Sequence, residues 1–228
     1  MGFDRVSFLL LIININYLDA KNPIIVENLL GIKRQIGVYQ KSKKPLMFAD
    51  IKEIIKGINE SKLSEIKKLR DKSLILIGFS GGFRRSELVS ITKDDIEFVK
   101  EGVKIFVKKS KSDQSGEGMI KAIPSFRNLE YCPVNHLRKW LQINKNDLLF
   151  PISDKNVALI IKKHALNAGL DDKKYAGHSL RSGFATSTAE LGASERNIMA
   201  MTGHKSVEMV RRYICLLYTS DAADEDLR

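Results

Sequence analysis

Residues 96–123 read IEFVKEGVKIFVKKSKSDQSGEGMIKAI, and their alternation limits the folds open to this chain. Apolar and polar residues alternate over 96–99, 103–107 and 119–123, which is the period of a half-buried strand. A Lys-Glu-Gly turn separates the first two segments, and a polar loop separates the last two. We therefore expect three short strands in one small antiparallel sheet.

Helical periods lie on both sides of this sheet. Before it, apolar residues recur at three- and four-residue spacing after Asp50, a candidate helix cap. The other segments with a helical period are 24–36, 64–77, 84–90, 134–143, 155–168, 180–191, 194–201 and 207–214. The predicted fold class is α+β and mainly α-helical, with helices around a small three-stranded antiparallel sheet.

The length of 228 residues suits one full domain and part of another. Residues 37–45, GVYQKSKKP, have the composition of an exposed linker between two helical patterns. We expect residues 1–45 to end a first helical domain and residues 46–214 to form the main one. Residues 215–228, CLLYTSDAADEDLR, resemble a translated sequencing adapter and are interpreted as a non-native tail.

The charge balance favours a polyanion as partner. The chain has 38 Lys and Arg against 27 Asp and Glu, a formal net charge of +11. Such a surplus fits either a solvated lysine-rich surface or a nucleic-acid-binding protein. The longest apolar stretch, residues 8–13, is far shorter than the roughly 20 residues of a membrane span. We therefore expect no membrane association. Cys132 and Cys215 form no CxxC pair, which is typical of a reducing compartment, so we expect a cytoplasmic protein.

Residues 78–82, GFSGG, match the GxSxG motif of a hydrolase nucleophile elbow. That motif needs a parallel sheet whose strands alternate with helices, whereas the predicted strands cluster in one stretch. We interpret the glycines as a turn that ends the preceding helix and positions the residues after it.

Three separated groups of polar residues stand out in the sequence, and each of them by itself is a weak signal. In the second group, residues three apart share one helical face, so an imidazole and a guanidinium can address the same ligand. The groups are Arg84, Arg85 and Glu87; His178 and Arg181; and His204 followed by Tyr213.

The order of these residues, with lysines on the predicted hairpin between the first two groups, resembles the tyrosine recombinase family, the phage integrases and their relatives. The strings GFRRSEL, KSKSDQ, HSLRSGFAT and GHKS are similar to that family's boxes, and the likeness covers about residues 46–214. It implies the catalytic-domain fold of the family and an enzyme of DNA recombination and integration. Such an enzyme cleaves and rejoins double-stranded DNA through a 3′-phosphotyrosine, as a tetramer, without metal or other cofactor.

The resemblance also implies the roles of single residues. It selects Arg84 over Arg85, because the family's arginine directly follows the Gly-Phe pair, and makes Glu87 a supporting acid. Lys111 is the matching hairpin lysine, with Lys108, Lys109 and Lys121 as alternatives. The implied catalytic residues are Arg84, Lys111, His178, Arg181, His204 and the nucleophile Tyr213. Residues 1–45 would be the end of the family's core-binding domain, with its linker.

These residue types suit attack on a phosphodiester. Arginine forks can contact the non-bridging oxygens in pairs. A tyrosine hydroxyl has a pKa near 10 and needs activation, so His178 would either accept its proton or hold the phosphate. Lys111 would protonate the departing 5′-oxygen.

Other basic residues and histidines have simpler interpretations. Basic residues of the linker and hairpin are expected to contact DNA phosphates: Lys41, Lys43, Lys44, Lys108 and Lys109. The histidines lack the spacing of a zinc site, so no metal is expected. His136 and His164 are expected to be solvated helix residues.

Two other functions would use a similar residue set. One is a DNA-binding protein of the same fold that does not cut, and the other is a type IB topoisomerase-like activity without strand exchange. We expect the chain as it stands to have low activity, because most of a first domain and a helix after Tyr213 are missing from the pattern.

Overall fold

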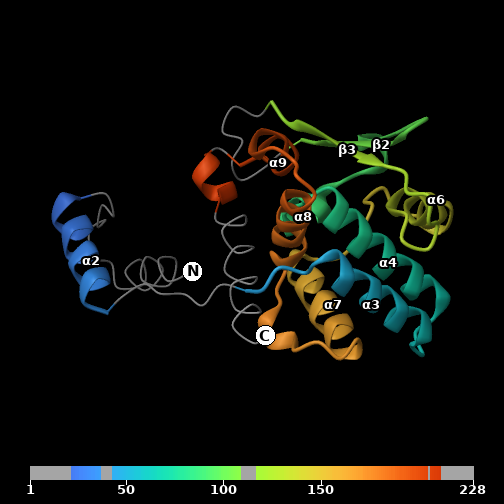
Figure 1. Cartoon of the computed structure of the whole chain (residues 1–228), viewed down its shortest axis with the longest axis horizontal. Helices are drawn as coiled ribbons and strands as arrows, with labels where there is room; N and C mark the ends of the chain where they lie inside the picture. The colour runs from blue at the N-terminus through green and yellow to red at the C-terminus, as the bar shows by residue number, and fades with distance from the viewer. Residues whose placement is uncertain (1–21, 37–42, 109–116, 205, 212–228) are drawn as a thin grey trace, which may run out of the picture. The chain divides into compact units, whose positions relative to one another are not determined.

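The computed structural model describes residues 22–36, 43–108, 117–204 and 206–211 (Figure 1). The chain divides into two compact units, the first ending at Ser42 and the second beginning at Lys43. The first unit contains helix α2 (Pro23–Ile36), which has no buried residue. Asn22 Oδ1 accepts a hydrogen bond of 3.0 Å from Ile24 N, so Asn22 caps this helix and Pro23 occupies its first turn.

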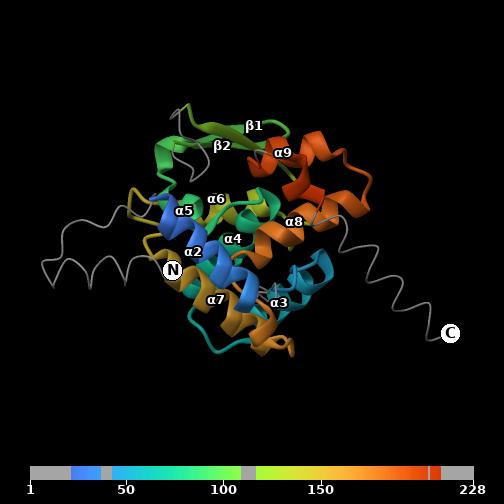
Figure 2. The ribbon, with the colours of Figure 1, turned by 90° about the vertical axis from the view of Figure 1, so that its left-hand side faces the viewer.

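The second unit is mainly helical. Its helices are α3 (Phe48–Glu60), α4 (Glu65–Ser80), α5 (Arg85–Ser90), α6 (Pro133–Ile143), α7 (Asp154–Asn167), α8 (Ser179–Glu190) and α9 (Glu195–Thr202). Short 3-10 turns cover Lys93–Asp95 and Asp172–Lys174, and residues 207–211 are helical. Figures 1 and 2 show the strands at one end of the helical body, next to α6 and α9. The predicted fold class is confirmed.

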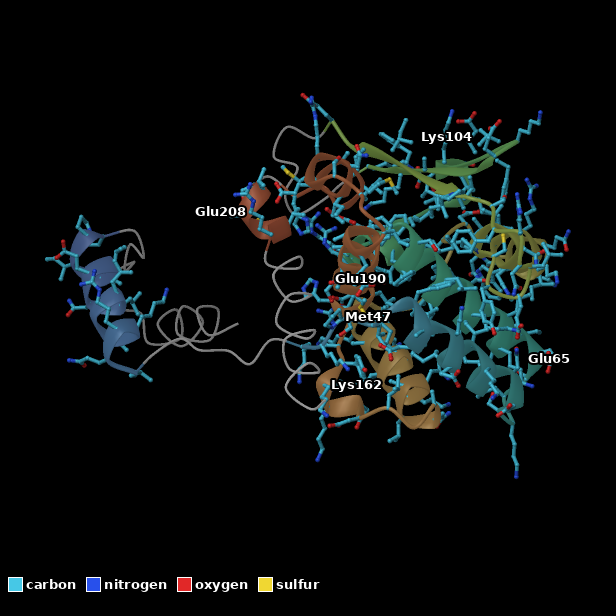
Figure 3. All side chains as sticks on the ribbon, viewed as in Figure 1. Met47, Glu65, Lys104, Lys162, Glu190 and Glu208 are labelled. Carbon is cyan, nitrogen blue, oxygen red and sulfur yellow. The ribbon has the colours of Figure 1, made fainter. Side chains whose placement is uncertain are left out.

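The sheet is three-stranded and antiparallel, as predicted. Strands β1 (Ile96–Val99), β2 (Gly102–Val107) and β3 (Met119–Pro124) lie in the order β1-β2-β3. Val103, Ile105 and Val107 of β2 are buried, whereas Lys104 is exposed on the opposite face (Figure 3). This alternation gives the sheet one apolar face, which packs on the helices.

Helix α3 shows the predicted apolar period but a different start. Its four isoleucines, Ile51, Ile54, Ile55 and Ile58, are buried. We expected Asp50 to be the residue before the helix, but it lies in the first turn of the helix. The Asp50 carboxylate accepts a hydrogen bond of 2.9 Å from Met47 N, so it satisfies the helix start from inside.

Helix α4 is longer than the predicted 64–77, because Gly78 does not end it. A Cβ at Gly78 would lie 2.9 Å from Leu180 Cδ1 and 3.2 Å from Leu88 Cδ2. The glycine therefore allows α4 to pack closely against α8 and α5, and the chain turns only at Gly81 and Gly82. Gly82 has a φ of 54°, a left-handed conformation that favours glycine.

The structure also bears on the GxSxG match and on membrane insertion. Ser80 lies in the last turn of α4 and is buried, which is not the exposed strand-to-helix elbow of a hydrolase. Within the described ranges, no helix combines the length and the apolar character needed to cross a bilayer.

Candidate active site

Glu87 holds Arg84 at the start of α5. The Glu87 carboxylate accepts hydrogen bonds from Arg84 N at 2.9 Å and from Arg84 Nη1 at 2.6 Å, and its side chain is fully buried. A second guanidinium nitrogen, Nη2, donates to Gly203 O at 3.2 Å. The guanidinium is thus fixed between α5 and the turn after α9. Arg85 takes another course, since its side chain packs against Gly177, where a Cβ would overlap its Cδ.

His178 and Arg181 lie one turn apart on α8 but in different surroundings. His178 is the residue before the helix and is exposed. Arg181 is 3% exposed, and its Nη1 donates a hydrogen bond of 2.9 Å to Gly82 O, in the turn that precedes Arg84. The guanidinium therefore lies inside the site, whereas the imidazole, on the residue before the helix, is exposed.

His204 lies in the turn after α9 and is buried. Gly203, just before it, has a φ of 66°, and this left-handed residue turns the chain out of the helix. His204 Nδ1 lies 2.7 Å from Thr202 Oγ1, and Ile198 O lies 2.6 Å from the same hydroxyl oxygen. The Thr202 hydroxyl therefore contacts the imidazole directly, a role that the sequence interpretation missed.

The electrostatics of His204 reflect its neighbours. Burial lowers its pKa to about 4, and the positive charges of Arg181, Arg84 and Lys121 act in the same direction, while Glu87 opposes them. The ring is therefore neutral at neutral pH. A neutral imidazole among fixed cations can donate one hydrogen bond but is a poor proton acceptor.

Lys121 of β3 is the least expected residue of the site. Its side chain is fully buried, and its Nζ donates to Gly81 O at 2.8 Å and to Met201 O at 2.5 Å. The Glu87 carboxylate lies 4.0 Å from the same nitrogen. Sequence reasoning considered Lys121 only as an alternative to Lys111, without recognising its burial.

The structure thus brings together most of the predicted catalytic residues that it describes. The start of α5, the first turn of α8, the turn after α9 and the inner face of β3 meet at one place, and α8 and α9 lie side by side (Figures 1 and 2). The groups that meet are Arg84, Glu87, Arg181, His204 and Lys121. Lys111 and Tyr213 lie outside the described residues.

Some of the lysines predicted to contact DNA lie in the described part of the chain, and others do not. Lys41 and Lys109 lie outside the described residues. Lys43 Nζ donates to Lys173 O at 2.6 Å, and Lys44 N donates to Lys174 O at 2.8 Å, so both anchor the start of the second unit. Lys108 Nζ lies 2.8 Å from Asp95 Oδ1.

The expectation that His136 and His164 are solvated is wrong. His164 is 1% exposed, and its Nε2 lies 2.8 Å from Asp71 Oδ2. His136 is 6% exposed, and its Nε2 lies 2.8 Å from Glu130 O. Both rings face the core and have polar partners there, so they are structural. Within the described ranges, no three His, Cys, Asp or Glu side chains form a set that could hold a metal ion.

Comparison with known proteins places this geometry in a family. Residues 44–219 match the model of the phage integrase family. The integrase/recombinase xerD homolog of Selenomonas ruminantium is 44% identical over 209 residues, which are 86% of this chain and 60% of that protein. The tyrosine recombinase XerC of Caldanaerobacter subterraneus subsp. tengcongensis is 33% identical over 199 residues, 87% of this chain and 54% of that protein. The chain thus spans 60% or less of the length of these relatives.

Solved structures agree on the fold. The XerH site-specific recombinase in its post-cleavage complex with palindromic difH substrate has a TM-score of 0.65 at 22% identity, covering 82% of this chain and 55% of that one. The XerA recombinase has a TM-score of 0.61 at 20% identity, covering 97% of this chain and 82% of that one. The family model, the relatives and the fold agree, and the chain belongs to the phage integrase family.

Proposed function

We propose that this chain is the catalytic part of a site-specific DNA recombinase that breaks and rejoins strands through a 3′-phosphotyrosine. One observation carries the proposal: two guanidinium groups from separate elements, Arg84 and Arg181, are fixed beside a neutral His204. Membership of the phage integrase family supports the same function.

The arrangement suits the charge of the reaction. Attack on a phosphodiester places additional negative charge on the non-bridging oxygens in the transition state. Donors that are already oriented toward those oxygens stabilise that charge without reorganising. Arg84 and Arg181 supply charged forks, because guanidinium stays protonated at any working pH. His204 supplies one further neutral donor.

The proposed covalent step balances without an added reagent. The Tyr213 oxygen attacks phosphorus, a bond from Oη to phosphorus forms, and the bond from phosphorus to the 5′-oxygen breaks. The phenolic proton passes to a base, and Lys111 gives a proton to the departing 5′-oxygen. A 5′-hydroxyl then attacks the phosphotyrosine and restores the phenol. One phosphoester replaces another in each step, so the reaction consumes no nucleotide or oxidant.

His178 is the proposed base. The low pKa of His204 makes that ring a poor proton acceptor near neutral pH. His178, by contrast, is exposed just before α8, the helix that carries Arg181. It can therefore meet an incoming phenol from the solvent side of the site.

The domain organisation and the partners form part of the proposal. We assign residues 1–45 to the end of a core-binding domain with its linker, residues 46–214 to the catalytic domain and residues 215–228 to a non-native tail. The partners are double-stranded DNA and further copies in a tetramer, in the cytoplasm. The net charge of +11 supports a DNA partner, and a solved relative, lambda integrase, was crystallised as a dimer on a core site. The proposed phosphate contacts are Lys41, Lys43, Lys44, Lys108 and Lys109.

Covalent capture tests this function. The chain is mixed with a pool of duplexes that carry a nick and a randomised central segment, so that a cleaved strand loses its short 5′-hydroxyl piece and cannot be resealed. We expect a complex that survives detergent, and sequencing of the captured DNA identifies the target.

Tyr213→Phe is the matched control, because it removes only the attacking oxygen. Binding should remain and covalent capture should disappear. Capture by the Phe variant would assign the nucleophile to another residue, and binding without capture by the unaltered chain would indicate a non-cleaving DNA-binding protein. Relaxation of supercoiled plasmid without strand exchange would indicate the topoisomerase-like activity.

A further inference from the structure

Strand β3 has a charged residue on its buried face and an apolar residue on its exposed face. Lys121 lies on the inner face, where the next inward residue, Ile123, and the cross-strand partner, Ile105, are buried. Ile120, one residue earlier, is 62% exposed. A buried ammonium is costly unless hydrogen bonds or opposite charge compensate it, so a lysine at this position requires an explanation.

The partners of the ammonium account for its burial. Nζ lies 2.8 Å from Gly81 O and 2.5 Å from Met201 O. It lies 4.8 Å from the centre of the Phe83 ring and 4.0 Å from Glu87 Oε2. Two carbonyls, an aromatic face and a carboxylate therefore surround the charge.

The two carbonyls belong to the segments that receive the arginines. Gly81 ends α4, and the carbonyl of the next residue, Gly82, accepts the hydrogen bond from Arg181. Met201 lies in the last turn of α9, and the carbonyl of Gly203 beyond it accepts the hydrogen bond from Arg84. One ammonium thus ties together the two backbone turns on which both guanidiniums rest.

We propose that Lys121 is a positioning residue for strand transfer, which fixes the turn after α4 to the end of α9 and so sets the spacing between Arg84, Arg181 and His204. This role rests on the proposed recombinase function and extends it to a residue outside the six proposed catalytic groups. Lys121 acts through the backbone and does not touch the substrate.

The charges around Lys121 agree with such a role. Its pKa is lowered to about 7, chiefly by burial; the Glu87 carboxylate opposes this shift, and the positive charges of Arg181 and Arg84 add to it. The titratable and charged groups that face it are Glu87 of α5, Arg84 before α5, Arg181 of α8 and His204 after α9. The ammonium donates to two carbonyls and its side chain is fully buried, so it presents no surface to a leaving group.

Two substrates separate positioning from proton donation. The first is a nicked duplex, identified by the capture experiment, with an ordinary scissile phosphate. The second carries sulfur in place of the 5′-bridging oxygen. A thiolate leaves without being protonated, since a thiol has a pKa of about 8.5, far below that of an alcohol. Loss of a proton donor is therefore rescued on the sulfur substrate, whereas loss of geometry is not.

Single-turnover rates are measured at saturating DNA for the unaltered chain and three variants. Lys121→Met, which keeps the length of the side chain without its charge, is expected to slow both substrates alike, by about tenfold to a hundredfold, as a misplacement of about 1 Å does. Lys111→Met should slow the oxygen substrate by about a hundredfold or more and recover on the sulfur substrate. Lys104→Met, on the exposed face of the same sheet (Figure 3), should leave both rates and the melting temperature unchanged.

Each other result overturns the proposal in a distinct way. Recovery of Lys121→Met on the sulfur substrate would make Lys121 the proton donor, and unchanged rates on both would leave it without a role. If Lys121→Met does not fold, Lys121→Gln, which can still donate to one carbonyl, takes its place. Failure of both to fold would assign Lys121 to stability alone. Because a nicked duplex that cannot be resealed accumulates even slow cleavage, absence of any covalent complex after prolonged incubation of the unaltered chain would refute the recombinase function itself, a result separate from those of the variants.

Discussion

Thr202 lies behind His204, and its single hydroxyl hydrogen has two acceptors within reach. Oγ1 is 2.7 Å from His204 Nδ1 and 2.6 Å from Ile198 O. When the hydroxyl donates to Nδ1, the proton of the neutral ring resides on Nε2, where it can be donated to a phosphate oxygen; when it donates to Ile198 O, Oγ1 accepts from Nδ1–H instead. The orientation of the hydroxyl therefore decides which ring nitrogen carries the proton.

Thr202→Val tests this selection, because valine keeps the shape and removes the hydroxyl. The single-turnover cleavage rate should fall by about tenfold, the equivalent of roughly 1.4 kcal/mol for one hydrogen bond, while DNA affinity stays constant. Thr202→Ser should restore the rate. A valine variant as fast as the unaltered chain would show that Thr202 has no influence on the tautomer.

Glu87 is an acid that faces both Arg84 and Lys121, and its removal should affect both stability and catalysis. Breaking a buried ion pair from one side leaves the other charge uncompensated, so Glu87→Gln should lower the free energy of unfolding by roughly 3 kcal/mol. Urea unfolding measures this change, and cleavage assays should show a loss of rate through the freed Arg84.

Glu97→Gln is the matched control for Glu87. Glu97 lies on the exposed side of β1, 3.8 Å from Lys104 Nζ, and the two side chains are 68% and 45% exposed. Exposed pairs contribute about 0 to 1 kcal/mol, so this variant should unfold almost as the unaltered chain does. Equal effects at both positions would contradict the assignment of Glu87 to the buried cluster.

At the scale of single residues, sequence reasoning found the chemistry but not the environment. Family likeness selected Arg84 and Arg181, and the structure brings both to one place. Burial was missed for Lys121, although its even spacing from Met119 and Ile123 on the strand places it on the inward face. His136 and His164 were missed in the same way: each shares the buried face of its helix with apolar residues such as Leu137 and Ala165. Only tertiary packing decides whether such a face is covered.

At the scale of the elements, Gly78 shows how packing overrides local preference. In a helix interior, alanine is more favourable than glycine by about 1 kcal/mol. Gly78→Ala would therefore stabilise an isolated helix. In α4 the added Cβ would lie 2.9 Å from Leu180 Cδ1 and 3.2 Å from Leu88 Cδ2, so these two buried leucines would have to repack. We expect Gly78→Ala to destabilise the chain by about 1 to 3 kcal/mol, as overpacking does, measured by urea unfolding.

Gly57→Ala in α3 is the control for this overpacking. The nearest atoms to its Cβ would lie at 3.8 Å, an ordinary contact distance. The helix preference should therefore dominate, and the variant should be as stable as the unaltered chain or more stable by up to about 1 kcal/mol. A Gly78 variant that is also stabilised would show that α4 can shift without loss.

The predicted elements were right in the sheet and wrong at the end of α4. Strand periods and turn residues predicted the sheet almost to the residue, because alternation over β1, β2 and β3 follows directly from one buried face. The end of α4 was placed too early, because a glycine within a helical pattern has the same appearance whether it stops the helix or accommodates a neighbour. The neighbour, Leu180, is far away in sequence and became visible only in the fold.

At the scale of the whole molecule, two buried basic groups, Lys121 and His204, link the site to the stability of the protein as pH changes. The pKa of Lys121 falls from an ordinary 10.5 to about 7 on folding, first because of burial. Between these values the unfolded chain binds a proton that the folded chain has lost. Stability from this group therefore rises as pH increases from about 7 toward 10. His204, with its pKa lowered to about 4, acts in a lower window: stability is lost as pH falls from about 6.5 to 4.

Lys121→Met should abolish the change of stability above pH 7 and keep the change between pH 4 and 6.5. For the unaltered chain, we expect the free energy of unfolding to rise between pH 7 and 9 by up to about 1.4 kcal/mol per pH unit, the limit for one proton. The Met variant should be flat over that range, and Lys104→Met should retain the rise. Denaturant unfolding at intervals of half a pH unit measures all three. A rise that persists in Lys121→Met would locate the titrating group elsewhere, and a flat profile for the unaltered chain would show that the Lys121 pKa is not lowered by folding.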